Sequence, residues 1–140
     1  MRGFLLDTNF ISELRKPAPE KKVLQWLDSV NENALHLSVL TLGELSKGIT
    51  LMPKSKRQQQ LLDWYQLDLQ LRFAGRLLPI DVRIAEKWGI MAANGFLNGK
   101  PLSVIDGLIA ATAVTHDLIL VTRNAKDFRD HIKDLFNPWD

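Results

Sequence analysis

Short apolar runs alternate along this chain with longer segments whose apolar residues recur at helical spacing. The short runs are bounded by turn or cap residues, as buried parallel strands usually are, and they lie at 3–6, 35–39, 77–80 and 118–121. In the longer segments the apolar repeat of about 3.6 residues predicts helices at 8–15, 19–30, 41–51, 55–73, 82–97 and 103–116. We therefore expect an α/β sandwich with a mostly parallel central sheet.

The 140 residues suffice for one ordinary domain, and no repeat or linker divides them, so we expect a single domain over 1–140. Apolar residues make up 46% and charged residues 24%, which is typical of a globular protein, while a net charge of +2 is too small to establish nucleic-acid binding. The absence of cysteine excludes disulfides, thiolate metal sites and cysteine nucleophiles. With no signal peptide or membrane span in the sequence, we expect a cytoplasmic protein.

Four acidic residues, Asp7, Glu44, Asp106 and Asp127, lie within or just after segments that are otherwise apolar. Asp7 ends the first apolar run, and Asp127 follows the last one. A parallel sheet binds its ligands in the crevice at the carboxyl ends of its strands, where the connecting helices begin. Acids that are far apart in the sequence are therefore predicted to meet at that edge of the sheet.

Each acid also has a purely structural explanation as part of a helix N-terminus. The sequences that fit a capping box or a cap are Thr41-x-x-Glu44, Ser103-x-x-Asp106, more loosely Asn124-x-x-Asp127, and Asp7 before Thr8. The two explanations are compatible, because helices that leave the same sheet edge bring their N-termini around one crevice. Capping explains single acids better than it explains four.

Carboxylates that converge in a partly dry cleft repel one another unless protonation, a basic partner or a bound cation relieves the repulsion. With no cysteine and only three histidines, the cluster suits Mg²⁺ or Mn²⁺ better than zinc. Mg²⁺ keeps several waters, so it can hold a phosphate and present an attacking water, which is the chemistry of phosphodiester hydrolysis. At the end of the last predicted strand, the Thr122 hydroxyl could orient a ligand, and the Arg123 guanidinium could meet either a phosphate or a local acid.

The predicted helix at 55–73 is apolar on more than one face. A helix of this kind must be buried on several sides, so part of it is expected to meet another subunit. This pattern favours a homodimer.

Several motifs occur together in this chain: Leu5-Leu6-Asp7-Thr8-Asn9, a helix with Glu44, Asp106-Gly107-Leu108-Ile109-Ala110-Ala111-Thr112-Ala113, Leu120-Val121-Thr122-Arg123-Asn124-Ala125-Lys126-Asp127-Phe128, and the ending Phe136-Asn137-Pro138-Trp139. As a set they resemble the PIN domain, in particular the VapC and FitB toxins of bacterial toxin-antitoxin pairs. The resemblance covers essentially the whole chain, and the ending is similar to the FitB branch.

The resemblance implies a Rossmann-like α/β/α sandwich whose acidic pocket binds Mg²⁺ or Mn²⁺ and hydrolyses RNA. It matches Asp7, Glu44 and Asp106 to three core acids that would hold the metal, and the fourth pocket residue is Asp127 or Asn124. In-line attack by water would leave a 3′ hydroxyl and a 5′ phosphate. The residues expected to orient water, ligands or substrate are Thr8, Asn9, Thr122, Arg123 and Asn124.

The resemblance further implies a type II toxin whose endoribonuclease activity is silenced by a small cognate antitoxin of the VapB or FitA kind, which inserts a side chain, often Arg, into the pocket. A homodimer is expected, and a dimer of dimers fits the chain equally. Promoter DNA would be contacted only through the antitoxin. The alternative is a FitB-like partner of a DNA-binding antitoxin with little nuclease activity of its own. Haloacid-dehalogenase-like enzymes fit less well, because they need Asp-x-Asp where this chain has Asp7-Thr8-Asn9.

Overall fold

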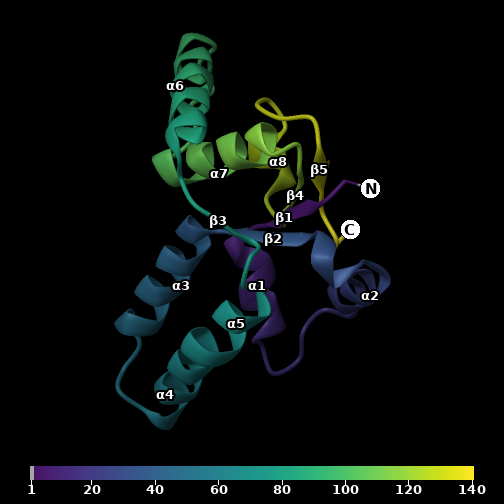
Figure 1. Cartoon of the computed structure of the whole chain (residues 1–140), viewed down its shortest axis with the longest axis vertical. Coiled ribbons are helices and arrows are strands. Elements are labelled where there is room, and N and C mark those ends of the chain that lie inside the picture. Colours follow the sequence, from purple (N-terminus) through teal and green to yellow (C-terminus); the bar gives the residue numbers. More distant parts are fainter. Residues whose placement is uncertain (1) are drawn as a thin grey trace.

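The computed structural model describes residues 2–140 and places a five-stranded sheet between two layers of helices (Figure 1). The strands are ordered β3-β2-β1-β4-β5, and every pairing is parallel. Their bounds are Phe4–Leu6 (β1), Leu35–Ser38 (β2), Leu77–Leu78 (β3), Ile119–Val121 (β4) and Leu135–Phe136 (β5). The predicted α/β fold with a parallel central sheet is confirmed.

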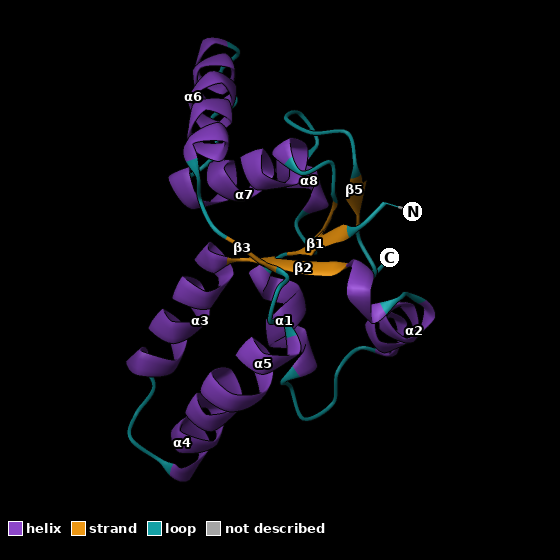
Figure 2. Cartoon of the chain, viewed as in Figure 1, coloured by secondary structure: helices purple, strands orange, loops and turns teal. Residues whose placement is uncertain are grey.

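Figure 2 shows helices covering both faces of this sheet. One layer holds α1 (Thr8–Leu14), α2 (Lys21–Ser29), α3 (Val39–Leu51), and a long helix in which α4 (Lys56–Asp63), the π-helical segment η2 (Trp64–Leu69) and α5 (Gln70–Arg72) follow one another without a break. The other layer holds α6 (Val82–Leu97), α7 (Val104–Thr115) and α8 (Ala125–Phe128). None of the helices in residues 2–140 is both long and apolar enough to cross a membrane.

The helix and strand segments expected from the sequence are all present, and the differences lie at short elements and at element ends; α2, for example, begins at Lys21 instead of 19. Helix α3 begins at Val39 instead of 41, because the Ser38 side chain caps it by accepting a hydrogen bond from the Leu40 N–H at 3.1 Å. Strand β5, helix α8 and the short 3₁₀ helix η1 (Glu32–Ala34) were not expected. Elements of two to four residues are too short to display a hydrophobic period.

Side chains from the two faces of the sheet form two separate apolar clusters. Leu5 and Leu6 are neighbours in β1 and enter different clusters, because successive strand residues point to opposite faces. The cluster toward α1, α2 and α3 includes Phe10, Val23, Leu45 and Phe73. The cluster toward α7 and α8 includes Ile109, Ala113, Leu120 and Phe128.

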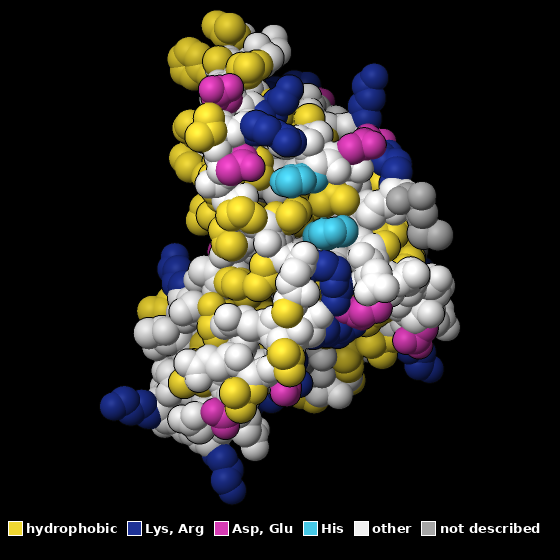
Figure 3. Space-filling view, in the orientation of Figure 1, with side chains coloured by type: hydrophobic (Ala, Val, Ile, Leu, Met, Phe, Trp, Pro, Cys, Tyr) yellow, Lys and Arg dark blue, Asp and Glu magenta, His cyan; other side chains and the backbone are white. Residues whose placement is uncertain are grey.

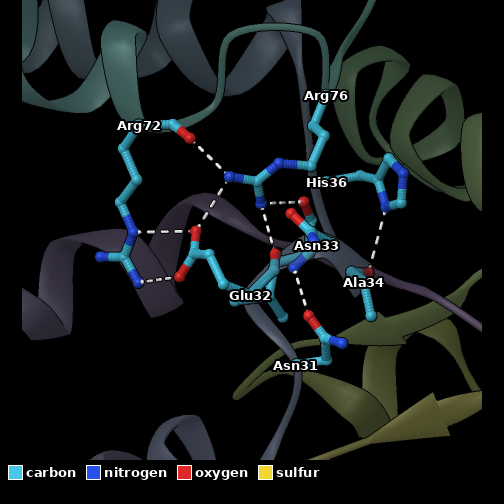
Figure 4. A network of polar contacts seen from close by, with 8 residues as sticks. Asn31, Glu32, Asn33, Ala34, His36, Arg72 and Arg76 are labelled. Atoms are coloured by element: carbon cyan, nitrogen blue, oxygen red, sulfur yellow. Dashed lines mark hydrogen bonds and ion pairs between the residues drawn. The ribbon is translucent and has the colours of Figure 1, made fainter.

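The amino-terminal end of β2 is fixed by a polar network that lies away from the strand ends where ligands bind (Figure 4). Arg72 contacts both carboxylate oxygens of Glu32 at 3.1 and 2.7 Å, and Arg76 contacts the same carboxylate at 3.0 Å. Arg76 also donates to the Leu35 carbonyl at 2.8 Å. The network ties the end of the long helix to the start of β2.

The order in which strands are added to the sheet reverses between β1 and β4, which are parallel neighbours. From β1 the chain proceeds through α1 and α2 to β2 on one side, and from β4 it proceeds through α8 to β5 on the other. A crevice at the carboxyl ends of the strands forms at such a switch point in open α/β sheets. Asp7 follows β1 directly, and Thr122 follows β4.

Candidate active site

A cavity of about 400 Å³ opens at this switch point. Its lining is rich in charge, with four carboxylates and two cationic side chains. The residues that line it are Asp7, Thr8, Asn9, Ser12, Glu13, Lys16, Glu44, Asp106, Arg123, Asn124 and Trp139. Three of the four acids singled out in the sequence therefore face one cavity, and the fourth, Asp127, does not.

Asp7 is buried at the bottom of the site, with 6% of the residue exposed. One carboxylate oxygen accepts the Thr8 N–H at 2.8 Å, so Asp7 caps α1 as the sequence suggested. The other oxygen accepts the Thr122 hydroxyl at 2.8 Å. The ends of β1 and β4 are thus joined through this one side chain.

Burial raises the pKa of Asp7 above its ordinary value, and the nearby charges of Asp106 and Glu44 raise it further. The hydrogen bonds from Thr122 and Thr8 oppose this shift without overcoming it. Removal from water is thus the main cost of charging Asp7, and a bound cation would offset that cost.

Glu44 reaches the cavity from α3, one turn inside the helix. Its Oε1 accepts the Thr8 hydroxyl at 2.6 Å, and the Thr8 hydroxyl also lies 3.1 Å from that of Thr41. The prediction of a capping box at Thr41 and Glu44 is wrong, because Ser38 caps α3 and Thr41 is buried inside the helix. Thr8 instead connects Glu44 to the start of α1.

Asp106 lies in the first turn of α7, where Ser103 is the cap residue and its hydroxyl accepts the Asp106 N–H at 3.2 Å. The predicted cap at Ser103 is therefore present. The cap places the side chain of Asp106 at the helix N-terminus and beside the cavity. Capping and site formation occur together at this position, as the geometry of a shared sheet edge allows.

The loop after β4 is held by reciprocal contacts with α1. Asn9 donates to the Thr122 hydroxyl at 3.3 Å and accepts the Arg123 N–H at 3.3 Å. The Thr122 hydroxyl also accepts the Asn124 N–H at 3.1 Å. Thr8, Asn9, Arg123 and Asn124 all line the cavity, whereas Thr122 is buried behind Asp7.

The two candidates for a fourth pocket residue are placed differently. Asn124 precedes α8 and lines the cavity, while Asp127 is exposed within α8 and lies outside the lining. The Asn124 side chain makes no capping hydrogen bond. The Asp127 N–H donates instead to the Asn124 carbonyl at 2.9 Å, which is a backbone contact. The geometry therefore favours Asn124 as the pocket residue.

Glu13 is a buried acid of the site that the sequence reasoning did not single out, and 5% of the residue is exposed. Burial alone would raise the pKa of Glu13, but donors from Lys16, the Glu20 N–H and Trp139 outweigh that effect and lower the pKa below its ordinary value. The donors lie at 3.0, 3.1 and 3.2 Å. The signal in the sequence was an acid on the apolar face of α1, three positions after Phe10.

The donor set fits a hard cation better than a soft one, because the lining offers carboxylate, hydroxyl and amide oxygens and no sulfur. Within residues 2–140 no group of three His, Cys, Asp or Glu side chains is arranged to hold an ion by itself. Mg²⁺ is commonly held by one or two carboxylates and retains several waters, so direct contact with all three acids is not required. The raised pKa of Asp7 agrees with a site that accepts positive charge.

The parallel sheet, the switch-point cavity and its acids define an α/β protein with a carboxylate-lined pocket at the carboxyl ends of its strands. The family model described as PIN domain matches residues 4–133, so the chain belongs to the PIN-domain family. The resemblance noted in the sequence motifs is thereby confirmed.

Known members of the family are similar to this chain over almost its whole length. A protein named VapC ribonuclease Y4jK from Sinorhizobium fredii is 37% identical, with 97% of each chain covered. A protein named Toxin FitB from Neisseria gonorrhoeae is also 37% identical, with 96% of this chain and 97% of that toxin covered. A solved structure of FitAB bound to an IR36 DNA fragment contains a chain with a TM-score of 0.93 and 35% identity, covering 98% of this chain and 96% of that one.

Proposed function

We propose that this protein is the toxin of a type II toxin-antitoxin system and acts in the cytoplasm as a metal-dependent endoribonuclease, with Mg²⁺ or Mn²⁺ as its cofactor. The observation that carries the proposal is the meeting of Asp7, Glu44 and Asp106 in one cavity, from the end of β1, from α3 and from α7. The relatives named as VapC ribonuclease and as toxin FitB support the same activity and the same biological setting.

In this proposal Asp7 and Asp106 hold the principal ion, and Glu44 and Asn124 complete the pocket. A bound Mg²⁺ supplies Lewis acidity toward a phosphate oxygen and lowers the pKa of a coordinated water. Thr122 and Thr8 orient the two carboxylates to which they donate, Asp7 and Glu44. Water attacks phosphorus in line, the bond to the 3′ oxygen breaks, and the products are a 3′ hydroxyl and a 5′ phosphate.

The test uses purified, antitoxin-free protein incubated with total bacterial RNA and Mg²⁺, with new 5′ ends mapped by sequencing. We expect discrete cuts that EDTA abolishes. Asp106→Asn should slow cutting by about 100-fold or more, because an amide replaces a proposed metal ligand. An Asp106→Asn protein that cuts RNA with normal Mg²⁺ dependence would contradict the assignment.

Two further variants test the fourth pocket residue. Asn124→Ala should slow cutting, whereas Asp127→Asn should cut at nearly the wild-type rate because Asp127 does not line the cavity. Slow cutting by Asp127→Asn with unimpaired Asn124→Ala would assign the role to Asp127.

We further propose that a small VapB- or FitA-like antitoxin binds this chain and supplies the contacts to promoter DNA. The chain in the FitAB structure, which contains an IR36 DNA fragment, has the same fold over nearly the same length. That likeness also favours a second candidate function, in which the protein acts mainly within a promoter-binding complex. Two results together would favour this second function. The free, folded protein would cut no RNA with Mg²⁺ or Mn²⁺, and its complex with the antitoxin would bind promoter DNA tightly.

A further inference from the structure

Trp139 in the C-terminal tail lines the cavity, and the tail lies beside the loop that carries Arg123. The carbonyl of Phe136 in β5 accepts the Thr122 N–H at 3.0 Å, and the Asn137 side chain donates to the Arg123 carbonyl at 3.2 Å. The Trp139 N–H donates to the Asn137 side chain at 2.9 Å. The tail is therefore fixed to the backbone on both sides of Arg123.

The indole of Trp139 has a defined orientation because it is held at one edge and packed on α1. Its Nε1–H donates to the Glu13 carboxylate at 3.2 Å, and its ring lies edge to face with Phe10 at a centroid distance of 6.3 Å. Glu13 is itself fixed by Lys16 and by the Glu20 N–H. A buried acid with three donors thus anchors the C-terminal tryptophan.

The Arg123 side chain lies over this anchored ring. Its guanidinium carbon is 5.5 Å from the centre of the Trp139 ring, a distance at which a cation is attracted to the aromatic face. Within residues 2–140 the Arg123 guanidinium makes no ion pair and no hydrogen bond, although it lines the same cavity as four carboxylates. The pairing of Arg123 with a local acid, which the sequence left open, does not occur there.

We propose that Trp139, anchored by Glu13, is a positioning residue that holds the Arg123 guanidinium where it binds an RNA phosphate adjacent to the scissile one. This inference rests on the proposed function. A guanidinium held over an indole by cation–π attraction uses none of its N–H groups for that contact, and their planar fork matches a phosphate. A cation at this place also offsets the repulsion between the acidic cavity and the RNA backbone.

The role of Trp139 is tested with Arg123→Ala, Trp139→Leu and the double variant, assayed with the RNA that the wild-type protein cuts. Loss of one phosphate contact should raise KM about tenfold for Arg123→Ala and leave kcat nearly unchanged, because that contact forms equally in the ground and transition states. Trp139→Leu should raise KM several-fold. The double variant should be no worse than Arg123→Ala, because Trp139 acts through Arg123.

Two variants serve as controls for this cycle. Trp139→Phe retains an aromatic face without the N–H and should restore part of the wild-type KM. Arg129→Ala removes an exposed positive charge that does not line the cavity and should behave as wild type. Binding of a fluorescein-labelled single-stranded RNA in the Asp106→Asn background should show a salt dependence reduced by about 0.7 in slope for Arg123→Ala.

Additive effects of the two substitutions, or a fall in kcat with an unchanged KM, would overturn the positioning role and leave Trp139 as a packing residue. Wild-type protein that cuts RNA while Arg123→Ala and Trp139→Leu retain its KM would overturn the inference and leave the proposed function intact. Wild-type protein that neither cuts nor binds RNA would instead overturn the proposed function, and this inference with it.

Discussion

Two buried carboxylates of the cavity have pKa values shifted in opposite directions, and their hydrogen-bond donors explain why. Glu13 faces the charged Lys16 and two N–H donors, which lower its pKa despite burial. Asp7 is desolvated, faces two other acids and receives only a neutral hydroxyl and one backbone N–H, so its pKa is raised. Glu13 is therefore a satisfied structural anion, while burial disfavours the charged form of Asp7, which a bound cation would stabilise.

The raised pKa of Asp7 predicts a pH-dependent stability difference between the wild type and Asp7→Asn in EDTA. Between the unfolded-state pKa and the higher folded-state pKa, the folded protein binds more protons, so this group lowers the free energy of unfolding as pH rises. Asn cannot ionise and still caps a helix. The Tm of Asp7→Asn relative to wild type should therefore increase by a few degrees as pH rises through that window.

Thermal denaturation over a pH series measures this difference, and Asp127→Asn is its control. Asp127 is exposed and lies outside the cavity, so its variant should follow wild type at every pH. Added Mg²⁺ should stabilise the wild type and raise its Tm. At a Mg²⁺ concentration one hundred times the dissociation constant, the free energy of unfolding should rise by about 2.7 kcal/mol, and the increase should be smaller for Asp7→Asn. A Tm gap that stays constant with pH would contradict the account of Asp7.

At the scale of elements, the position of Asp106 depends on close packing between α6 and α7. Gly107 follows Asp106 and is buried, and a Cβ atom built on it would lie 2.9 and 3.0 Å from two atoms of the Trp88 ring in α6. Contacts this short require the ring or one of the helices to move. The glycine thus allows α7 to bring the carboxylate to the sheet edge.

Gly107→Ala is expected to lower the free energy of unfolding by about 1–3 kcal/mol through this overpacking and to slow RNA cleavage by displacing Asp106. Gly89→Ala is the matched control, because Gly89 lies in α6 with no neighbouring atom within 4 Å of its added Cβ. That substitution should stabilise the protein by about 0.5–1 kcal/mol. Urea denaturation measures both effects, and equal stabilities for the two variants would refute the packing argument.

Elements with a sustained period were predictable from the sequence, and contacts between distant segments were not. The structure begins and ends α6 where the sequence predicted, because Asp81 caps it and its apolar residues repeat over sixteen positions. The rule for parallel sheet edges predicted that four acids meet, and Asp7, Glu44 and Asp106 line one cavity while Asp127 lies outside it. No local pattern links Glu13 to Trp139, which are 126 residues apart in the sequence. The capping-box spacing pointed to Thr41, whereas the residue that caps α3 is Ser38.

At the scale of the whole molecule, a large apolar surface lies on the outer side of α6 and the start of α7. Hydrophobic side chains cover much of the edge of the molecule where α6 lies (Figure 3). Phe96 and Leu97 are each 77% exposed, and the other large apolar residues exposed in these helices include Val82, Ile90, Val104 and Ile105. The long helix at 56–72, from which a dimer was expected, exposes fewer, namely Leu67 and Leu71.

We expect a homodimer that buries the α6–α7 surface, because contiguous exposed apolar patches of this kind mark association sites. Light scattering on a gel-filtration column should give the mass of two chains, or of four if dimers pair. Phe96→Glu places a charge in the contact and should raise the dimer dissociation constant about 30-fold or more. Gln25→Glu adds the same charge to an exposed position in α2, at the far end of the sheet in Figure 1, and should leave the mass unchanged. A wild-type monomer at high protein concentration, or a dimer that Phe96→Glu leaves intact, would show that this surface does not join two copies of the chain.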